Sequence, residues 1–290
     1  MNRAEFLASG AAVLVAAHAT PHSLSAKVHA IARAMPGRIG VYARTMAPGP
    51  ALVTYRAGQR FPTASTIKLL IMVTAYATEE VKPGTLDQTI VFNRGELIGG
   101  SDFMAGASNG ERFTVAQLIV PMIRVSDNTA SNMLIAHFGI AAINAVGARA
   151  GMTHTRLARR FLDYAAIAHH NQNVSTPADM GRLLYLIESG AREGTGTIVS
   201  ARHCRRMVAI MLGQTDRGGI PAALPRGTSV ANKTGEVDGT RNDVAIVQPY
   251  GDSPFILAIM TAEAYDYAAS YAAIRAVTRA TYGAASRTFA

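Results

Sequence analysis

The chain begins with a pattern typical of a helix followed by two paired strands. Over residues 25–35 apolar side chains share one helical face, which predicts a helix that ends at Pro36-Gly37. Residues 39–43 then alternate between apolar and polar side chains, and a second short run spans 52–56. Because the turn-forming Pro48-Gly49-Pro50 separates these two runs, we expect a β-hairpin.

The middle of the chain has the spacing of helices rather than strands. From Ser65 to about Ala209 apolar residues recur every three or four positions, most clearly in 114–124, 129–138 and 178–187. This part of the sequence therefore predicts a helical lobe.

Strand patterns return near the C-terminus, at 230–235, 242–247 and 255–261, with Asp238-Gly239 as the turn between the first two. A helical pattern over 266–282 closes the chain. Since strands and flanking helices stand at both ends, we expect an α+β fold. It would have a five-stranded antiparallel sheet built from both chain ends, terminal helices beside it, and an inserted all-helical lobe.

The length of 290 residues suits one large catalytic unit. We expect that catalytic domain over 20–290, with a sheet lobe made of 25–62 and 210–290 and a helical lobe made of 63–209. A signal peptide over 1–19 would precede it.

The expected signal peptide has a positive start, an apolar stretch and a cleavage pattern. Arg3 precedes an apolar run over about 7–17, and Ala17-His18-Ala19 is the small-x-small pattern that signal peptidases cut. A buried N-terminal helix is the alternative, because Glu5 stands beside the single positive charge. No later apolar stretch reaches the roughly 20 residues of a membrane span. We expect an exported protein, periplasmic or secreted, with no stable membrane insertion after signal removal.

Composition narrows the class of protein. Hydrophobic residues make up 49% and charged residues 16% of the chain, which argues against disorder and against a coiled coil. The net charge of +9 suits an anionic partner, but the arginines are scattered and there is no tryptophan, so we expect no nucleic-acid binding. The lone Cys204 makes no internal disulfide, and no metal-ligand spacing occurs. We expect a monomer that needs no cofactor or metal.

Lysine is scarce, and two of the few lysines lie in motifs that could carry out catalysis. The 28 basic residues include only four lysines. Ser65 opens an apolar helical run, and Lys68 follows one turn later on the same face. A helix N-terminus favours a developing oxyanion, and a buried lysine with a lowered pKa can accept the serine proton.

Two further motifs could complete such a site. Ser126-Asp127-Asn128 lies between helical segments, where a serine can relay a proton and an asparagine can hold a carbonyl group. Lys233-Thr234-Gly235 lies in a strand, where a lysine and a hydroxyl suit a carboxylate and glycine allows close approach. The backbone amide of Glu236 could pair with that of Ser65 as an oxyanion hole. Each motif alone is also typical of helix caps or solvated lysines.

The three motifs, in this order and on a helix start, an inter-helix loop and a strand, resemble those of the class A β-lactamases. More broadly they are similar to those of the penicillin-recognising serine enzymes. The resemblance extends over about 25–290. It implies that Ser65 is the acylated nucleophile, Lys68 a proton acceptor, Ser126 a proton shuttle and Asn128 a substrate clamp.

The same resemblance places substrate recognition on the C-terminal strands. Lys233 and Thr234 would hold a substrate carboxylate, with Gly235 and Glu236 beside them. Arg241 could add a second cation, although a surface arginine is an equally good interpretation.

The sequence departs from the family where a glutamate normally activates the water that frees the enzyme. That position falls on about Phe161, and the asparagine that partners the glutamate falls near Ala165. Between 151 and 175 the only carboxylate is Asp163. It could serve as the base, or it could simply pair with Arg159 or Arg160.

Rapid acylation is therefore expected, whereas rapid release of the acyl group is not. The leading hypothesis is a serine hydrolase of the β-lactamase type that opens a β-lactam amide through Ser65. Alternatives are a D-alanyl-D-alanine peptidase or another amidase or esterase acting on peptidoglycan stems, and a sensor that is acylated once.

Overall fold

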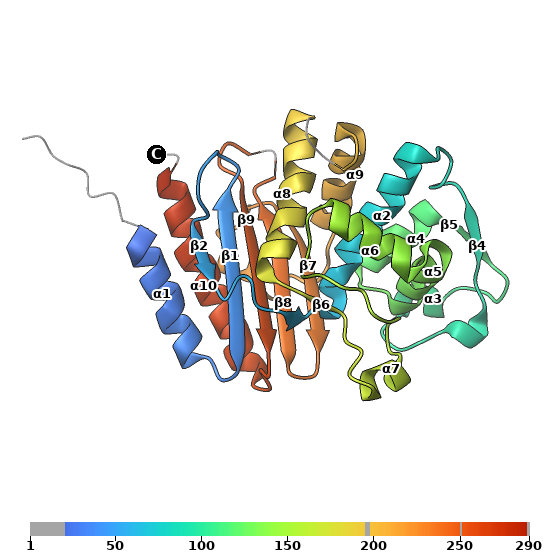
Figure 1. Ribbon diagram of the computed structural model, residues 1–290, viewed down its shortest axis with the longest axis horizontal. Helices are drawn as coiled ribbons and strands as arrows, with labels where there is room; N and C mark the ends of the chain where they lie inside the picture. The colour runs from blue at the N-terminus through green and yellow to red at the C-terminus, as the bar shows by residue number, and fades with distance from the viewer. Residues whose placement is uncertain (1–20, 195–197, 250, 289–290) are drawn as a thin grey trace, which may run out of the picture.

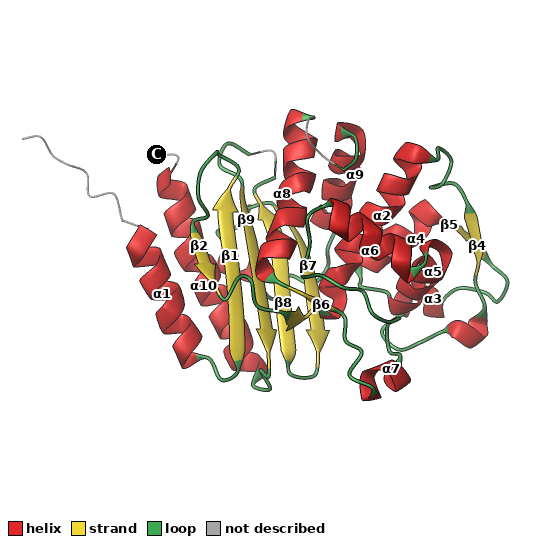
Figure 2. Cartoon of the chain, viewed as in Figure 1, coloured by secondary structure: helices red, strands yellow, loops and turns green. Residues whose placement is uncertain are grey.

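Five strands from both ends of the chain form one antiparallel sheet (Figures 1 and 2). The computed structural model describes residues 21–194, 198–249 and 251–288, so the expected signal peptide and its cleavage site at Ala19 lie outside the described residues. The strand order is β2-β1-β9-β8-β7. The strands are β1 (Arg38–Thr45), β2 (Val53–Tyr55), β7 (Val230–Val237), β8 (Thr240–Val247) and β9 (Phe255–Ala262).

The central strand β9 is buried on both faces, which explains its continuous apolar sequence. Successive side chains point to opposite faces of the sheet. Phe255, Leu257 and Ile259 therefore join one core, while Ile256 and Met260 join the other.

The terminal helices cover the first of these faces. Helices α1 (Pro21–Ala34) and α10 (Tyr267–Thr288) lie side by side, and α10 packs on β8 and β9 (Figure 1). Helix α10 runs beyond the predicted end at 282, because its last turns continue to pack through residues such as Ala285.

The helical lobe and α8 cover the second face (Figure 2). Helix α8 packs against β1 and β9 as well as against α9. The helices of this part are α2 (Lys68–Val81), α3 (Asp102–Ala105), α4 (Val115–Arg124), α5 (Asn128–Phe138), α6 (Ile140–Arg149), α7 (Tyr164–Ala168), α8 (Pro177–Glu193) and α9 (Ala201–Leu212). The 3-10 turns are η1 (Ala64–Ile67), η2 (Arg94–Glu96) and η3 (Pro221–Ala223).

Two short ladders within this region were not predicted. They pair β3 (Phe61–Pro62) with β6 (Val174–Ser175), and β4 (Thr89–Val91) with β5 (Arg112–Thr114). Strands of two or three residues are too short to show alternation in a sequence.

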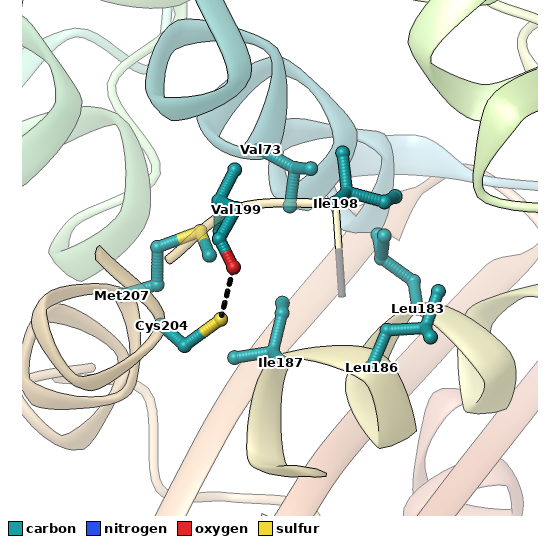
Figure 3. A pocket seen from close by; sticks show the side chains of 8 residues that line it. All are labelled: Val73, Leu183, Leu186, Ile187, Ile198, Val199, Cys204 and Met207. Carbon is teal, nitrogen blue, oxygen red and sulfur yellow. Dashed lines mark hydrogen bonds between the residues drawn. The ribbon is translucent and has the colours of Figure 1, made fainter. Parts of the chain in front are cut away.

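The core beneath α8 and α9 is closely packed around the single cysteine. The cavity there, of about 10 Å³, is lined by apolar side chains from α2, α8 and α9, together with Ile198 and Val199 (Figure 3). Cys204 is buried at its wall, and its Sγ donates to the Val199 carbonyl oxygen at 3.7 Å. This environment agrees with an inert thiol.

No single helix in the described ranges is both long and apolar enough for a membrane crossing. Helices α5 and α6 meet that test only as a pair, bent by 85°.

Candidate active site

Ser65 lies in the 3-10 turn η1, immediately before the buried helix α2. The turn is fixed from outside, since Thr63 donates its backbone amide to the Asn173 carbonyl oxygen at 2.9 Å. Ala64 has a left-handed backbone with φ of 44°. Such strained residues persist where the surroundings over-determine them, so Ser65 is held in a fixed place.

Lys68 is fully buried one turn after Ser65. Its Nζ donates to the carbonyl oxygen of Ser126 at 2.6 Å, to Ser126 Oγ at 3.1 Å and to Asn128 Oδ1 at 2.8 Å. Burial, together with the nearby charge of Lys233, lowers the pKa of Lys68 well below its ordinary value, while Asp127 opposes the shift. A lysine in this environment can act as a base.

Ser126 stands between the two lysines of the site. Its Oγ accepts from Lys233 Nζ at 3.1 Å as well as from Lys68, and its backbone is left-handed with φ of 60°. A hydroxyl that touches two lysines is well placed to pass a proton.

The loop that presents Ser126 is held by its neighbours. Asp127 caps α5 by accepting from the Ala130 amide at 2.8 Å, and it also accepts from the Met104 amide at 3.0 Å. The side-chain Nδ2 of Asn128 donates to the Gly99 carbonyl oxygen at 2.8 Å. The serine and asparagine are thereby fixed against Lys68.

The edge strand β7 brings the third motif to Ser65. Lys233 is fully buried, and burial lowers its pKa to about 8. A side chain at Gly235 would place its Cβ 2.7 Å from the Thr63 carbonyl oxygen and 3.0 Å from the Ser65 amide nitrogen. Only glycine allows β7 to lie this close to η1. Ser65 and Glu236, the residue after this glycine, both line the same cleft.

These elements enclose a cleft of about 300 Å³. Its lining includes four predicted site residues besides Ser65, namely Ser126, Asn128, Thr234 and Glu236, and six that were not predicted, namely Gly100, Asp102, Val125, Gln214, Thr215 and Asp216. Among the described residues, no group of three or more His, Cys, Asp or Glu side chains is placed to hold a metal ion.

Phe161, at the position expected for the glutamate, lies over Lys68. Lys68 Nζ is 4.4 Å from the centroid of its ring, and the ring is buried. Asn132 fixes Phe161 through both backbone groups: its Nδ2 donates to the Phe161 carbonyl oxygen at 3.1 Å, and its Oδ1 accepts from the Phe161 amide at 2.8 Å. An apolar, positioned side chain thus covers Lys68.

Asp163 caps a short helix and is not among the residues that line the cleft. Its Oδ1 accepts from the Ala166 amide at 3.0 Å, at the start of α7. Burial lowers the pKa of Arg159, and the charge of Asp163 opposes that shift. This geometry favours the structural interpretation of Asp163 over the interpretation as a deacylation base.

Arg241 is also absent from the cleft lining. Its guanidinium lies 3.6 Å from the centroid of the Tyr267 ring, and its Nη1 donates to the carbonyl oxygens of Val237 at 2.9 Å and Thr240 at 2.7 Å. Its Nε is 3.6 Å from Glu236 Oε1. The expected second cation is therefore engaged by carbonyl oxygens of β7 and β8 and lies near a carboxylate.

A sequence profile described as the β-lactamase enzyme family matches residues 23–285. The chain belongs to the β-lactamase enzyme family. It is 33% identical over 235 residues to the carbapenem-hydrolyzing β-lactamase KPC of Klebsiella oxytoca, covering 78% of this chain and 76% of that protein.

Solved structures of β-lactamases and a related protein have the same fold. A β-lactamase from Burkholderia phymatum matches with a TM-score of 0.80 and 27% identity, over 91% of this chain and 98% of the other. A leucine-to-glutamate variant of PBP-A, in an acyl-enzyme complex with penicillin G, matches with a TM-score of 0.79 and 25% identity, over 90% and 95%. These matches confirm the predicted α+β fold and the family resemblance.

Two residues at or near the cleft, Asn132 and Asp216, were not predicted from the sequence. Asn132 lies four positions after Asn128 on the same helix, so helical spacing could have indicated that it faces the same region. Asp216 precedes the strands in a loop without a recognisable pattern, and no sequence signal marks it.

Proposed function

We propose that this member of the β-lactamase family is a serine hydrolase that opens a β-lactam amide through an acyl-enzyme on Ser65 and releases the product slowly. The observation that carries the proposal is the contact of Ser126 Oγ with both Lys68 and Lys233 beside the nucleophile. It joins the three motifs into one proton-transfer network. Family membership supports the same reaction class.

Acylation would begin with transfer of the Ser65 hydroxyl proton to neutral Lys68 as Oγ bonds to the lactam carbonyl carbon. The carbonyl π electrons move to its oxygen, which the amides of Ser65 and Glu236 stabilise. The C–N bond then breaks, and the nitrogen takes the proton of Ser126 Oγ. Lys68 replaces that proton with the one taken from Ser65, so the network returns to its starting state.

Release requires a water molecule activated at the ester, and the side chain over Lys68 does not provide a base. Phe161 has no proton acceptor, and Asp163 is engaged in capping α7. General-base catalysis contributes about 100-fold or more to such a step. We therefore infer that the lifetime of the acyl-enzyme is much longer than the time needed to form it.

A second candidate is a D-alanyl-D-alanine peptidase or a related amidase acting on peptidoglycan stems. The similarity to PBP-A and the apolar residue over Lys68 favour it. Release of D-alanine from a D-alanyl-D-alanine peptide, compared with opening of a penicillin, separates this activity from the first.

Peptide mapping after reaction with a penicillin tests the site of acylation. We expect the penicilloyl group on the peptide that contains Ser65, and no adduct on a Ser65→Ala protein. Ser200→Ala, at the start of α9 outside the cleft lining, is the matched control and should be acylated like the parent. An adduct that persists in Ser65→Ala would contradict the proposal.

We further propose that the protein is exported, because the N-terminal pattern and the β-lactamase relatives agree with this destination. Its partners would be small β-lactam or peptidoglycan-stem substrates met by a monomer. N-terminal sequencing of protein recovered from outside the cytoplasm tests the export, since a chain that still begins at Met1 would contradict signal removal.

A further inference from the structure

The cleft around Ser65 is acidic, although the chain as a whole is basic. The formal net charge of the protein is +9. The described residues that line the cleft nevertheless include the carboxylates of Asp102, Asp216 and Glu236, and no lysine or arginine. Lys68 and Lys233 lie beneath this surface with no exposed area. A substrate entering the cleft therefore meets negative charge first.

Two of these carboxylates, Asp216 and Glu236, raise the pKa of Lys233, the lysine expected to hold a substrate carboxylate. Burial lowers the pKa of Lys233, while Asp216, the buried Asp243 and Glu236 oppose the shift electrostatically. The positive charge of Lys233 is therefore offset by its own surroundings before any substrate arrives.

Glu236 also holds the second expected cation away from the substrate. Its Oε1 is 3.6 Å from Arg241 Nε and accepts a hydrogen bond from the Tyr271 hydroxyl. The Arg241 side chain is 12% exposed, whereas that of Glu236 is 41% exposed. The cleft is thus lined by the Glu236 carboxylate of β7 rather than by the Arg241 guanidinium of β8.

On the basis of the proposed acylation of Ser65, we propose that Asp216 and Glu236 make the cleft selective for substrates that carry an ammonium group near the acylating carbonyl. They also disfavour substrates with a second carboxylate. Unit charges several ångströms apart near a protein surface interact strongly enough to change a rate constant by about tenfold. Nearby water and salt reduce the effect without removing it.

Three penicillins with the same phenylacetyl core test this selectivity. Their α-carbon carries a hydrogen in benzylpenicillin, an ammonium group in ampicillin and a carboxylate in carbenicillin. Second-order rate constants for adduct formation are measured by intact-mass spectrometry at low salt. We expect the order ampicillin, benzylpenicillin, carbenicillin, with about a tenfold span between the first and the last. Equal rate constants for ampicillin and carbenicillin would overturn the proposal.

Charge-neutral variants locate the effect. Asp216→Asn and Glu236→Gln should each reduce the ampicillin-to-carbenicillin ratio, because each removes one carboxylate from the cleft while keeping a similar shape. Asp87→Asn is the matched control: it makes the same change in net charge at an exposed position outside the cleft lining, so the ratio should stay at the parent value. A ratio unchanged in both cleft variants would assign the selectivity to other groups.

A second series separates this inference from the proposed function. If no penicillin forms an adduct, the β-lactam reaction is wrong, and arylboronic acids then decide the charge preference. In these probes the serine oxygen donates a lone pair to boron and its proton passes to Lys68, so no β-lactam is needed. Aminomethyl-phenylboronic acid should bind about tenfold more tightly than carboxyphenylboronic acid. Equal Kd values, or no binding of either, would overturn the inference.

Discussion

At the scale of single residues, the contact between Phe161 and Lys68 supports the proposal that release of the acyl group is slow. The ring covers the lysine where the family otherwise has a glutamate, and Asn132 holds it there through two hydrogen bonds. On the proposed function, Phe161 would therefore leave the acylating groups intact and slow the release of the acyl group.

Replacing Phe161 tests whether this residue affects release of the acyl group. Phe161→Glu puts a carboxylate where a water can be activated, so we expect release of the penicilloyl group to become about 100-fold faster. Phe161→Leu is the matched control, since it changes the size of the side chain without adding a base, and its release should stay slow. The rates are measured by mass spectrometry after free penicillin is removed. Equal acceleration in both variants would assign the slow step to crowding instead.

The two lysines should give the acylation rate opposite dependences on pH. Lys68 must be neutral to accept a proton, so acylation falls as pH decreases through its lowered pKa. Lys233 must be charged to attract a substrate carboxylate, so acylation also falls as pH rises through about 8. Lys233→Arg keeps its charge at every accessible pH, and we expect the alkaline fall to disappear in that variant. An alkaline fall that remains unchanged in Lys233→Arg would assign it to another group.

At the scale of elements, the close approach of β7 to η1 assembles the site from parts far apart in the sequence. Gly235→Ala would force these elements apart, because the added Cβ meets the Thr63 carbonyl oxygen and the Ser65 amide. We expect acylation to slow by about 100-fold, the typical effect of a 1 Å displacement. Gly58→Ala is the control, since nothing lies within 4 Å of its Cβ. Parent-rate acylation by a folded Gly235→Ala protein would contradict this arrangement.

The sequence predicted the strands of the sheet well, because burial of a strand requires a regular pattern of apolar residues. Strand β9 reads as a continuous apolar run. The three motifs fall in the turn before α2, at the start of α5 and within β7. The position of the Arg241 side chain was not predictable, because it depends on contacts with Tyr267 and Glu236 that form only in the folded protein. The position of Phe161 over Lys68 could not be predicted either. The two residues come together only in the fold, and the sequence of 155–175 has no periodicity that would place Phe161.

At the scale of the whole molecule, the site lies where the two lobes meet. Lys68 and Ser126 belong to the helical lobe and Lys233 to the sheet, so their contacts join both halves of the chain. Two cores, one on each face of the sheet, hold these halves in place. The basic surface attracts anions from a distance, whereas the carboxylates of the cleft select among them at short range.

The lifetime of the acyl-enzyme is the most direct test of the central claim, that Ser65 is acylated readily and freed slowly. Purified protein is mixed with benzylpenicillin, free penicillin is removed, and the intact mass is followed over time. We expect one penicilloyl group per chain that forms quickly and remains for many times its formation time. An adduct that clears as fast as it forms, with sustained penicillin hydrolysis, would show that this protein has an efficient deacylating base and would contradict the account.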